Sequence, residues 1–141
     1  MAETRLLQQQ GVQYSSPAAW NATSAAGASL QQLAHWLSTG PPELAGLSGR
    51  KGSIAVSKDA DFVVWTPGAL ADTSRSQMHS IHKLTPYPDT SLRGCVRATY
   101  VRGQLVFDEQ RSPAFPRSHS CGKVLYRQDF APDLQPRGMP K

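Results

Sequence analysis

KGSIAVSKDADFVVW, residues 51–65, is the stretch of this sequence with the clearest structural pattern. It predicts a short strand whose apolar content begins at Ile54, a polar turn at Ser57-Lys58-Asp59, and a longer strand over Phe62–Trp65. An apolar run without polar alternation is typical of a strand that is covered on both faces, and Thr66-Pro67-Gly68 is expected to end it. Nothing in the stretch offers acid–base or nucleophilic chemistry, so it is interpreted as scaffold.

A helix is predicted shortly before this stretch, over residues 29–39. Ser29 is a good N-cap, and the apolar residues after it follow helical spacing along one face: Leu30, Leu33, Ala34 and Leu37. We expect the three leucines of this stripe to be buried against the strand Phe62–Trp65. Gly40-Pro41 is expected to stop the helix, and Pro42 can open a second short helix over residues 42–47.

A β-hairpin is predicted from Arg93 to Phe107. Alternating residues of its first strand share one face (Val96, Ala98 and Tyr100), and Arg102-Gly103 stands at the turn, where glycine permits a positive φ. Together with the strand Phe62–Trp65, the hairpin forms a small β-sheet beside two helices. The predicted fold class is therefore α+β.

Composition divides the chain into three regions. Residues 1–28 are expected to form a weakly ordered N-terminal segment, because the small side chains between Asn21 and Ala28 bury little apolar area. Residues 29–110 carry the predicted helices and strands. Residues 111–141 hold five of the eleven prolines and are expected to form an irregular, disordered, basic tail.

The net charge of +5 does not indicate a nucleic-acid partner. Six basic and only two acidic residues lie after residue 110, so the excess charge is spread along the tail without clusters or interleaved aromatic residues. No apolar run approaches the roughly 20 residues that span a bilayer, and the first ten residues do not resemble a secretory signal. We expect a cytoplasmic protein that binds neither nucleic acid nor membrane.

The two cysteines do not form a disulfide framework or a zinc motif. Cys95 is interpreted as a small buried hydrophobe and Cys121 as a free thiol in the tail, with a disulfide between them as the less favoured alternative.

The four histidines have structural interpretations that outweigh a metal-binding one. His35 is expected to be a half-exposed helix residue and His119 a solvated residue of the tail. His79 and His82 are three residues apart in an extended segment, which points their side chains to opposite faces.

The charged residues of the 51–65 stretch are likewise interpreted as structural. Asp59 is expected to accept backbone donors in the turn, Asp61 to flank the strand, and Lys51 to be a surface cation.

Five segments, in this order, resemble the C-terminal part of the allantoinase group of cyclic amidohydrolases. They lie between about Ser29 and Glu109: Leu33-Ala34-His35-Trp36 with Glu43-Leu44-Ala45-Gly46-Leu47, Lys51-Gly52-Ser53-Ile54, Asp59–Trp65, His82-Lys83-Leu84-Thr85-Pro86-Tyr87 and Val101–Phe107. One departure is local: Ser57 stands where the family usually has glycine.

The resemblance implies a specific architecture and reaction. Residues 29–39 would be the last helix of the catalytic barrel, followed by a short second helix and part of the β-sandwich that flanks the barrel. The family's reaction is the hydrolytic ring opening of allantoin to allantoate in purine catabolism, in which zinc activates water. At 141 residues this chain is too short for a complete barrel, which needs roughly 250.

The resemblance also implies that this chain is silent by itself. The family's metal ligands precede the last barrel helix, and this chain contains no histidine-x-histidine pair, so no catalytic, cofactor-binding or metal-binding residue is assigned. No cofactor is expected for this chain, zinc belonging to the full-length family only. The expected partner is the rest of the barrel, or a homo-oligomer partner at full length. The alternative is a non-enzymatic, β-rich assembly or interaction module from the same superfamily.

Overall fold

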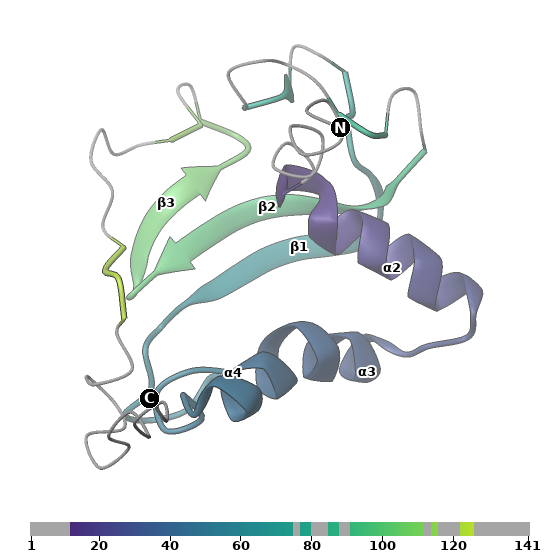
Figure 1. The fold of residues 1–141 in the computed structure, drawn as a ribbon. Coiled ribbons are helices and arrows are strands. Elements are labelled where there is room, and N and C mark those ends of the chain that lie inside the picture. Colours follow the sequence, from purple (N-terminus) through teal and green to yellow (C-terminus); the bar gives the residue numbers. More distant parts are fainter. Residues whose placement is uncertain are drawn as a thin grey trace, which may run out of the picture.

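The computed structural model describes residues 12–74, 77–79, 85–87, 91–111, 114–115 and 122–125. In chain order, its elements are η1 (Val12–Tyr14), α2 (Ser15–Ala25), α3 (Leu30–Ala34), η2 (His35–Thr39), α4 (Gly40–Ala45), β1 (Phe62–Leu70), β2 (Arg93–Val101) and β3 (Gln104–Asp108). Figure 1 shows helices beside one small sheet, which confirms the predicted α+β class. Most of the 111–141 region lies outside the described residues.

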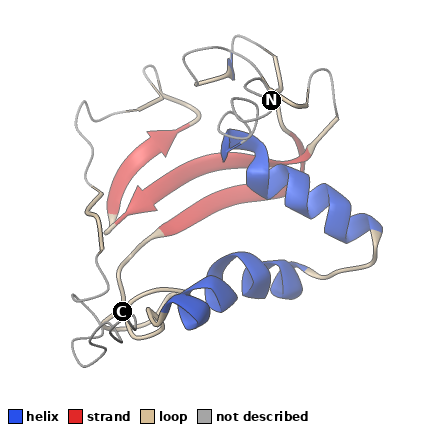
Figure 2. Cartoon of the chain, in the orientation of Figure 1, coloured by secondary structure: helices blue, strands red, loops and turns tan. Residues whose placement is uncertain are grey.

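The sheet has three antiparallel strands in the order β1-β2-β3. β2 and β3 form the predicted hairpin, with Val101 paired to Gln104 across a two-residue turn. Arg102 and Gly103 both have positive φ, of 50° and 75°, as the tight turns of twisted hairpins require. Figure 2 shows β3 at the edge of the sheet farthest from α3 and α4. The hairpin prediction is therefore confirmed.

Strand β1 differs from the prediction in length and in cover. It does not stop at Trp65 but continues through Pro67 to Leu70, with irregular pairing after Thr66 that accommodates the proline. The expected short strand at Ile54 is absent from residues 51–61, which form turns and irregular structure. Val63 and Val64, neighbours that point to opposite faces, are 49% and 45% exposed. The expectation that both faces are covered is wrong, because the described residues leave about half of each valine exposed.

Ser57 occupies a backbone conformation that favours glycine, with φ of 71°. We therefore expect Ser57→Gly to raise the free energy of unfolding by about 0.5–1 kcal/mol. Relief of left-handed strain, about 1–2 kcal/mol, exceeds the extra backbone entropy that glycine loses on folding, about 0.5–1 kcal/mol. Urea unfolding checks this, with Ser53→Gly as the control: Ser53 has ordinary φ, so the same change there should destabilise.

Helix α2 replaces the weak order that the sequence predicts up to residue 28. The helix has no clear apolar stripe, so periodicity gives no signal. Tertiary contacts stabilise it instead: Trp20 meets Trp65 edge to face at 6.0 Å, and Pro17 is fully buried. Figure 1 shows α2 lying across the ends of β1 and β2.

A cluster of buried apolar residues forms at one end of the sheet. Tyr14, Met78 and Leu92 are its buried members, and Ala71 and Tyr87 pack against it. The Tyr14 hydroxyl donates to the carbonyl oxygen of Asp72 at 3.1 Å, so the one polar atom of this side chain is satisfied. The cluster joins the start of α2 to the loop after β1.

The helix predicted over residues 29–39 begins as expected. Ser29 caps it: its side chain accepts from the Gln32 N–H at 3.3 Å, and Gln32 in return accepts from the Ser29 N–H at 2.8 Å. This reciprocal pair satisfies two donors that the first turn of a helix leaves without partners.

Gly40-Pro41 does not stop this helix. A π-helical turn, η2, carries it directly into α4, with the Gly40 N–H donating to the His35 carbonyl oxygen. The wider turn leaves room for the rings of Pro41 and Pro42, which in a regular α-helix would meet the carbonyl group four residues earlier. The helical segment of residues 30–45 is therefore continuous. It ends at Gly46, whose φ of 73° allows a Schellman closure.

Only one of the three striped leucines is buried. Leu33 is 4% exposed, whereas Leu30 is 42% and Leu37 is 48% exposed. Outside the helical segment itself, the element that α3 contacts most is α2 rather than β1. The predicted burial is therefore confirmed for Leu33 and wrong for Leu30 and Leu37, and the predicted packing of this stripe on the strand Phe62–Trp65 is not borne out.

Candidate functional site

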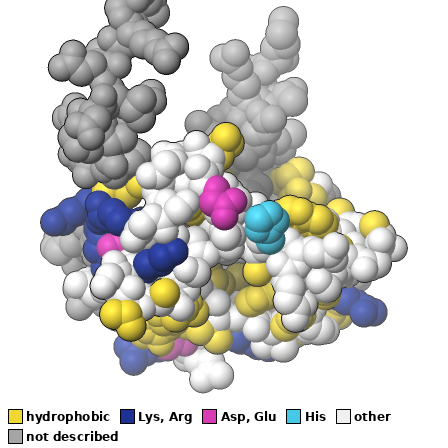
Figure 3. All heavy atoms as spheres, turned by 90° about the horizontal axis from the view of Figure 1, so that it is seen from below, with side chains coloured by type: hydrophobic (Ala, Val, Ile, Leu, Met, Phe, Trp, Pro, Cys, Tyr) yellow, Lys and Arg dark blue, Asp and Glu magenta, His cyan; other side chains and the backbone are white. Residues whose placement is uncertain are grey.

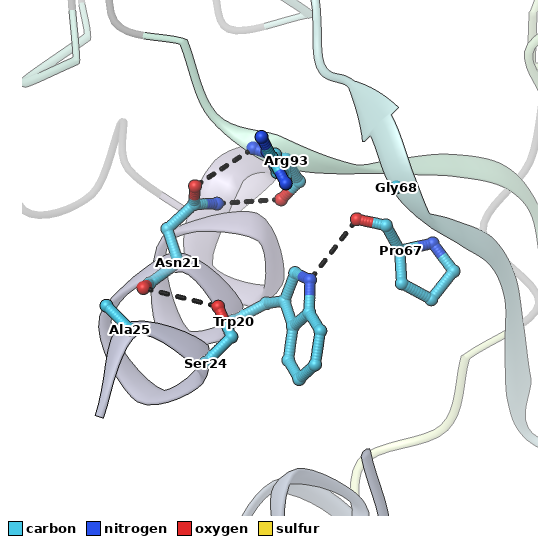
Figure 4. A pocket seen from close by; sticks show the side chains of 7 residues that line it. All are labelled: Trp20, Asn21, Ser24, Ala25, Pro67, Gly68 and Arg93. Atoms are coloured by element: carbon cyan, nitrogen blue, oxygen red, sulfur yellow. Dashed lines mark hydrogen bonds between the residues drawn. The ribbon is translucent and has the colours of Figure 1, made fainter. Parts of the chain in front are cut away.

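An open hollow of about 480 Å³ lies between α2 and the sheet. Helix α2 contributes four residues to its wall and the strands contribute three: Trp20, Asn21, Ser24, Ala25, Pro67, Gly68 and Arg93 (Figure 4). The wall is therefore built by three segments that are far apart in the sequence.

The polar groups of the wall are mostly engaged in holding α2 to the sheet. Asn21 Oδ1 accepts from the Arg93 N–H at 3.1 Å, and Asn21 Nδ2 donates to the Arg93 carbonyl oxygen at 2.8 Å. The Trp20 indole N–H donates to the carbonyl oxygen of Pro67 at 3.2 Å, where the strand pairing is irregular (Figure 4). Among the described residues that line the hollow there is no carboxylate, imidazole, thiol or amine, the groups that acid–base or nucleophilic catalysis uses.

No sequence pattern predicts a role for Trp20 or Asn21. Both lie in a segment of small and polar residues without apolar periodicity, so no sequence pattern marks them. Their roles depend on strands that lie more than 40 residues away in the sequence.

Lys51, Asp59 and Asp61 meet in one ionic cluster that Arg50 extends. Lys51 Nζ lies 2.9 Å from Asp59 Oδ2 and also pairs with Asp61, while Arg50 reaches Asp59 at 3.1 Å. Asp61 Oδ1 also accepts the Arg102 N–H at 2.7 Å, which ties the hairpin turn to the start of β1. Asp61 thus flanks the strand as predicted. Lys51, however, is only 19% exposed and is not the free surface cation that the sequence suggested.

Ion pairing keeps the cluster charged. The hydrogen bond from Lys51 is the main cause that lowers the pKa of Asp59. For Asp61, burial acts to raise the pKa, but hydrogen bonds from Lys51 and the Arg102 N–H lower it overall. Burial acts to lower the pKa of Lys51, and its two carboxylate partners raise it overall. A general base for neutral pH needs the opposite shift of a carboxyl group, so the cluster is structural.

The two histidines that the structure describes do not contribute to a metal site. His35 is exposed at the start of η2. The His79 N–H donates to Gln13 Oε1 at 3.0 Å, and its ring lies 5.5 Å from that of Phe107 and 4.8 Å from that of Phe115. His82, His119 and Cys121 lie outside the described residues. Within the part of the chain that is described, no three histidine, cysteine, aspartate or glutamate side chains come together, so these residues do not fit a zinc centre.

Cys95 is half-buried and hydrogen-bonded rather than simply packed as a hydrophobe. Its Sγ donates to Glu109 Oε1 at 3.0 Å, and Glu109 also pairs with Arg97. Burial, together with the hydrogen bond to the Glu109 carboxylate and its charge, raises the pKa of the Cys95 thiol to about 11. The thiolate is the nucleophilic form, so this cysteine is unreactive at neutral pH.

Alkylation is therefore expected to be slow at Cys95. In a Cys121→Ser background at pH 8, we expect iodoacetamide to react about a hundredfold more slowly than with an ordinary thiol of pKa about 8.5. The rate should rise about tenfold per pH unit up to about pH 11. Glu109→Gln should accelerate it, because losing the carboxylate lowers the pKa of Cys95. A rate that is already at its plateau at pH 8 would contradict this assignment.

Comparison with known proteins places the chain in a family. The sequence pattern of the amidohydrolase family matches residues 22–107. An allantoinase of Arabidopsis thaliana is 37% identical over 117 residues, which cover 80% of this chain and 22% of the relative. A Streptomyces avermitilis allantoinase is 32% identical over 96 residues, 68% of this chain and 21% of the relative. A D-hydantoinase of Ralstonia pickettii is 30% identical over 102 residues, 72% of this chain and 22% of the relative.

Two facts follow from these matches. The chain spans about a fifth of the length of the curated relatives it matches, with shares of 18% and 22% for two of them. The matched region contains the helical segment, the sheet and the ionic cluster, so the resemblance inferred from the sequence is confirmed. This chain belongs to the amidohydrolase family, and it is similar to allantoinases over part of their length.

Proposed function

We propose that this chain is the C-terminal portion of an allantoinase-like cyclic amidohydrolase. The full-length reaction would be the hydrolytic ring opening of allantoin to allantoate, in cytoplasmic purine catabolism. The similarity to several proteins named allantoinase carries this proposal, and similarity to a D-hydantoinase supports the broader class of cyclic amides.

Within this proposal the described residues act as scaffold. They anchor a helix to a sheet through Asn21 and Trp20, and they join a turn to a hairpin through the Lys51 cluster. They do not bring together the ligands that a zinc centre needs, so no step of ring opening is assigned to them. The chain by itself is expected to be catalytically silent.

The isolated chain is therefore expected to form no allantoate and to retain no stoichiometric zinc. Purified residues 1–141 are assayed with allantoin, and the metal content of the same sample is measured by mass spectrometry. Full-length Arabidopsis thaliana allantoinase provides the positive control. Turnover that survives chromatography and disappears on chelation would contradict the proposed silence.

A chimera tests the allantoinase assignment itself. The 117 matched residues of Arabidopsis thaliana allantoinase are replaced by the corresponding residues of this chain. We expect the chimera to hydrolyse allantoin, whereas the same enzyme with the segment deleted should not. A folded chimera that opens another cyclic amide but not allantoin would move the proposal to that substrate. A folded chimera with no hydrolase activity would overturn it.

The second candidate function is a non-enzymatic assembly or interaction module from the same superfamily. The exposed leucines of the helical segment favour it, because half-exposed apolar side chains in a row often mark an interface. The chimera separates the two candidates, since a module that no longer supports catalysis would fold in it without restoring hydrolysis.

A further inference from the structure

The outer edge of β3 is a different kind of surface from the apolar side of the helices. Figure 3 views the molecule from the side of α3 and α4, where hydrophobic side chains reach the surface in several places. β3 lies at the edge of the sheet farthest from those helices (Figure 2), and within the described part of the chain it pairs with β2 alone. A strand at the edge of a sheet offers backbone N–H and C=O groups with which another strand can pair.

The sequence of β3 does little to prevent such pairing. Proteins commonly protect an edge strand with lysine, proline or a bulge. The five residues of β3 (Gln-Leu-Val-Phe-Asp) include no lysine or proline, and Val106 and Phe107 favour strands. An irregularity in the pairing between Leu105 and Phe107 disturbs the middle of the strand. The end of β3 at Phe107 and Asp108 therefore needs another form of protection.

Two residues that follow the sheet, Ala114 and Phe115, cover this end of β3. The Glu109 N–H donates to the Arg97 carbonyl oxygen at 2.9 Å, toward β2. Because neighbouring N–H groups of an extended chain point to opposite sides, the Asp108 N–H points away from β2. Its acceptor is the Ala114 carbonyl oxygen, at 2.8 Å. Ala114 therefore occupies a donor on the outer edge of the sheet, where a further strand would bind.

A cluster of three rings holds Phe115 against β3. Its ring lies 5.5 Å from that of Phe107 and 4.8 Å from that of His79, which is itself 5.5 Å from Phe107. His79 belongs to an anchored loop: its N–H donates to Gln13 Oε1 at 3.0 Å, and the neighbouring Met78 is buried. Phe115 thus packs between a strand and a fixed loop, although 48% of it stays exposed.

We propose that Ala114 and Phe115 cap the outer edge of β3 and keep it from pairing with β3 of a second copy of this chain. A second copy fits this edge because two identical strands can pair antiparallel across a twofold axis, each supplying the same groups. The cap competes with that copy for the outward N–H of Asp108. This role does not depend on ring opening, and both capping residues follow the residues 22–107 that match the amidohydrolase family.

Phe115→Ser removes the ring that holds the cap, and Val124→Ser is the matched control. Both substitutions remove a large exposed apolar side chain without changing the charge, since Val124 is 73% exposed. In a dilute solution of the full chain, hydrogen exchange of the Asp108 amide, measured by NMR, is expected to accelerate at least tenfold in Phe115→Ser. It should stay within about twofold of the parent in Val124→Ser. Unchanged exchange of the amides that pair β1 with β2 verifies that the sheet remains folded.

Sedimentation velocity of the same samples over a range of concentrations measures self-association. We expect the dissociation constant of the Phe115→Ser dimer to be at least tenfold lower than that of the parent. The Asp108 amide should regain protection as the dimer forms, because β3 of the second copy then occupies it. Simple hydrophobic adhesion predicts the opposite order, since the variant has lost an apolar ring.

The two measurements can each overturn the proposal. Unchanged exchange of the Asp108 amide in Phe115→Ser would show that Phe115 does not hold a cap. Faster exchange without stronger self-association would overturn the protective role, and so would a dimer in which the Asp108 amide stays unprotected. Equal dimerisation of the Phe115→Ser and Val124→Ser variants would show that Phe115 does not control the association and would overturn the proposal as well.

Discussion

Gly94→Ala is expected to lower the free energy of unfolding by about 2–6 kcal/mol. Gly94 is buried at the start of β2 with φ of 108°, a backbone conformation that side chains with a Cβ rarely adopt. Strain of this kind costs about 1–3 kcal/mol, and an overpacked methyl group adds about 1–3 kcal/mol. Because a small domain is stable by only about 5–15 kcal/mol, the loss should be easily visible in a urea unfolding midpoint.

The steric part of this prediction comes from the Trp65 ring. A Cβ on Gly94 would lie 2.8 Å from Trp65 Cζ3 and 3.1 Å from Trp65 Cε3, whereas the Cα atom of Pro17, at 3.4 Å, would be in ordinary van der Waals contact. The Trp65 ring cannot retreat freely because it packs edge to face on Trp20, whose indole is itself hydrogen-bonded to the sheet. The glycine therefore permits the Trp65 ring of β1 to lie close to the backbone of β2.

Gly68→Ala provides the matched control on the same sheet. Gly68 has ordinary φ, and a Cβ there would meet no atom within 4 Å. The substitution is expected to be neutral or to stabilise by up to about 1 kcal/mol, because alanine restricts the unfolded chain. Similar losses in the two variants would show that the close approach of the Trp65 ring to Gly94 is wrong.

Leu33→Ala is expected to lower the free energy of unfolding by about 2–5 kcal/mol. Leu33 is the buried residue of the predicted stripe, and its loss removes apolar contacts and leaves a cavity. Leu37→Ala, on the same helix but 48% exposed, should cost less than about 1 kcal/mol in the isolated chain. Thermal or urea unfolding of both variants checks the contrast. If Leu33→Ala and Leu37→Ala destabilise the isolated chain equally, Leu37 is buried in it and the exposed surface of the helical segment is misassigned.

Local chemistry explains the parts of the fold that were predicted correctly. Ser29 and Gln32 are close enough in sequence to cap a helix by themselves, and Arg102-Gly103 specifies a two-residue hairpin turn. Hydrogen bonds within a few residues do not depend on the rest of the protein. The family resemblance has the same origin, because it rests on short segments in a fixed order.

Elements that are stabilised by residues far away in the sequence were not predicted. Helix α2 has no apolar stripe and is held by Trp65, Pro67 and Arg93, which no local pattern connects to it. The continuation through Pro41 required a π-helical turn that sequence rules for proline do not anticipate. The ionic cluster is a similar case. The local sequence predicts that Lys51 is a surface cation, but folding brings Asp59 and Asp61 into contact with its amine.

The sequence by itself determined the α+β class, the helix start at Ser29, the hairpin and the family, because these depend on residues that are close along the chain. Only the tertiary structure decided that Gly94 must be glycine, that Asn21 and Trp20 anchor α2, and that Leu33 is buried while Leu37 is exposed. Helical periodicity shows which residues share a face, but exposure depends on what packs against that face. In this chain, the described residues cover Leu33 and leave Leu37 uncovered.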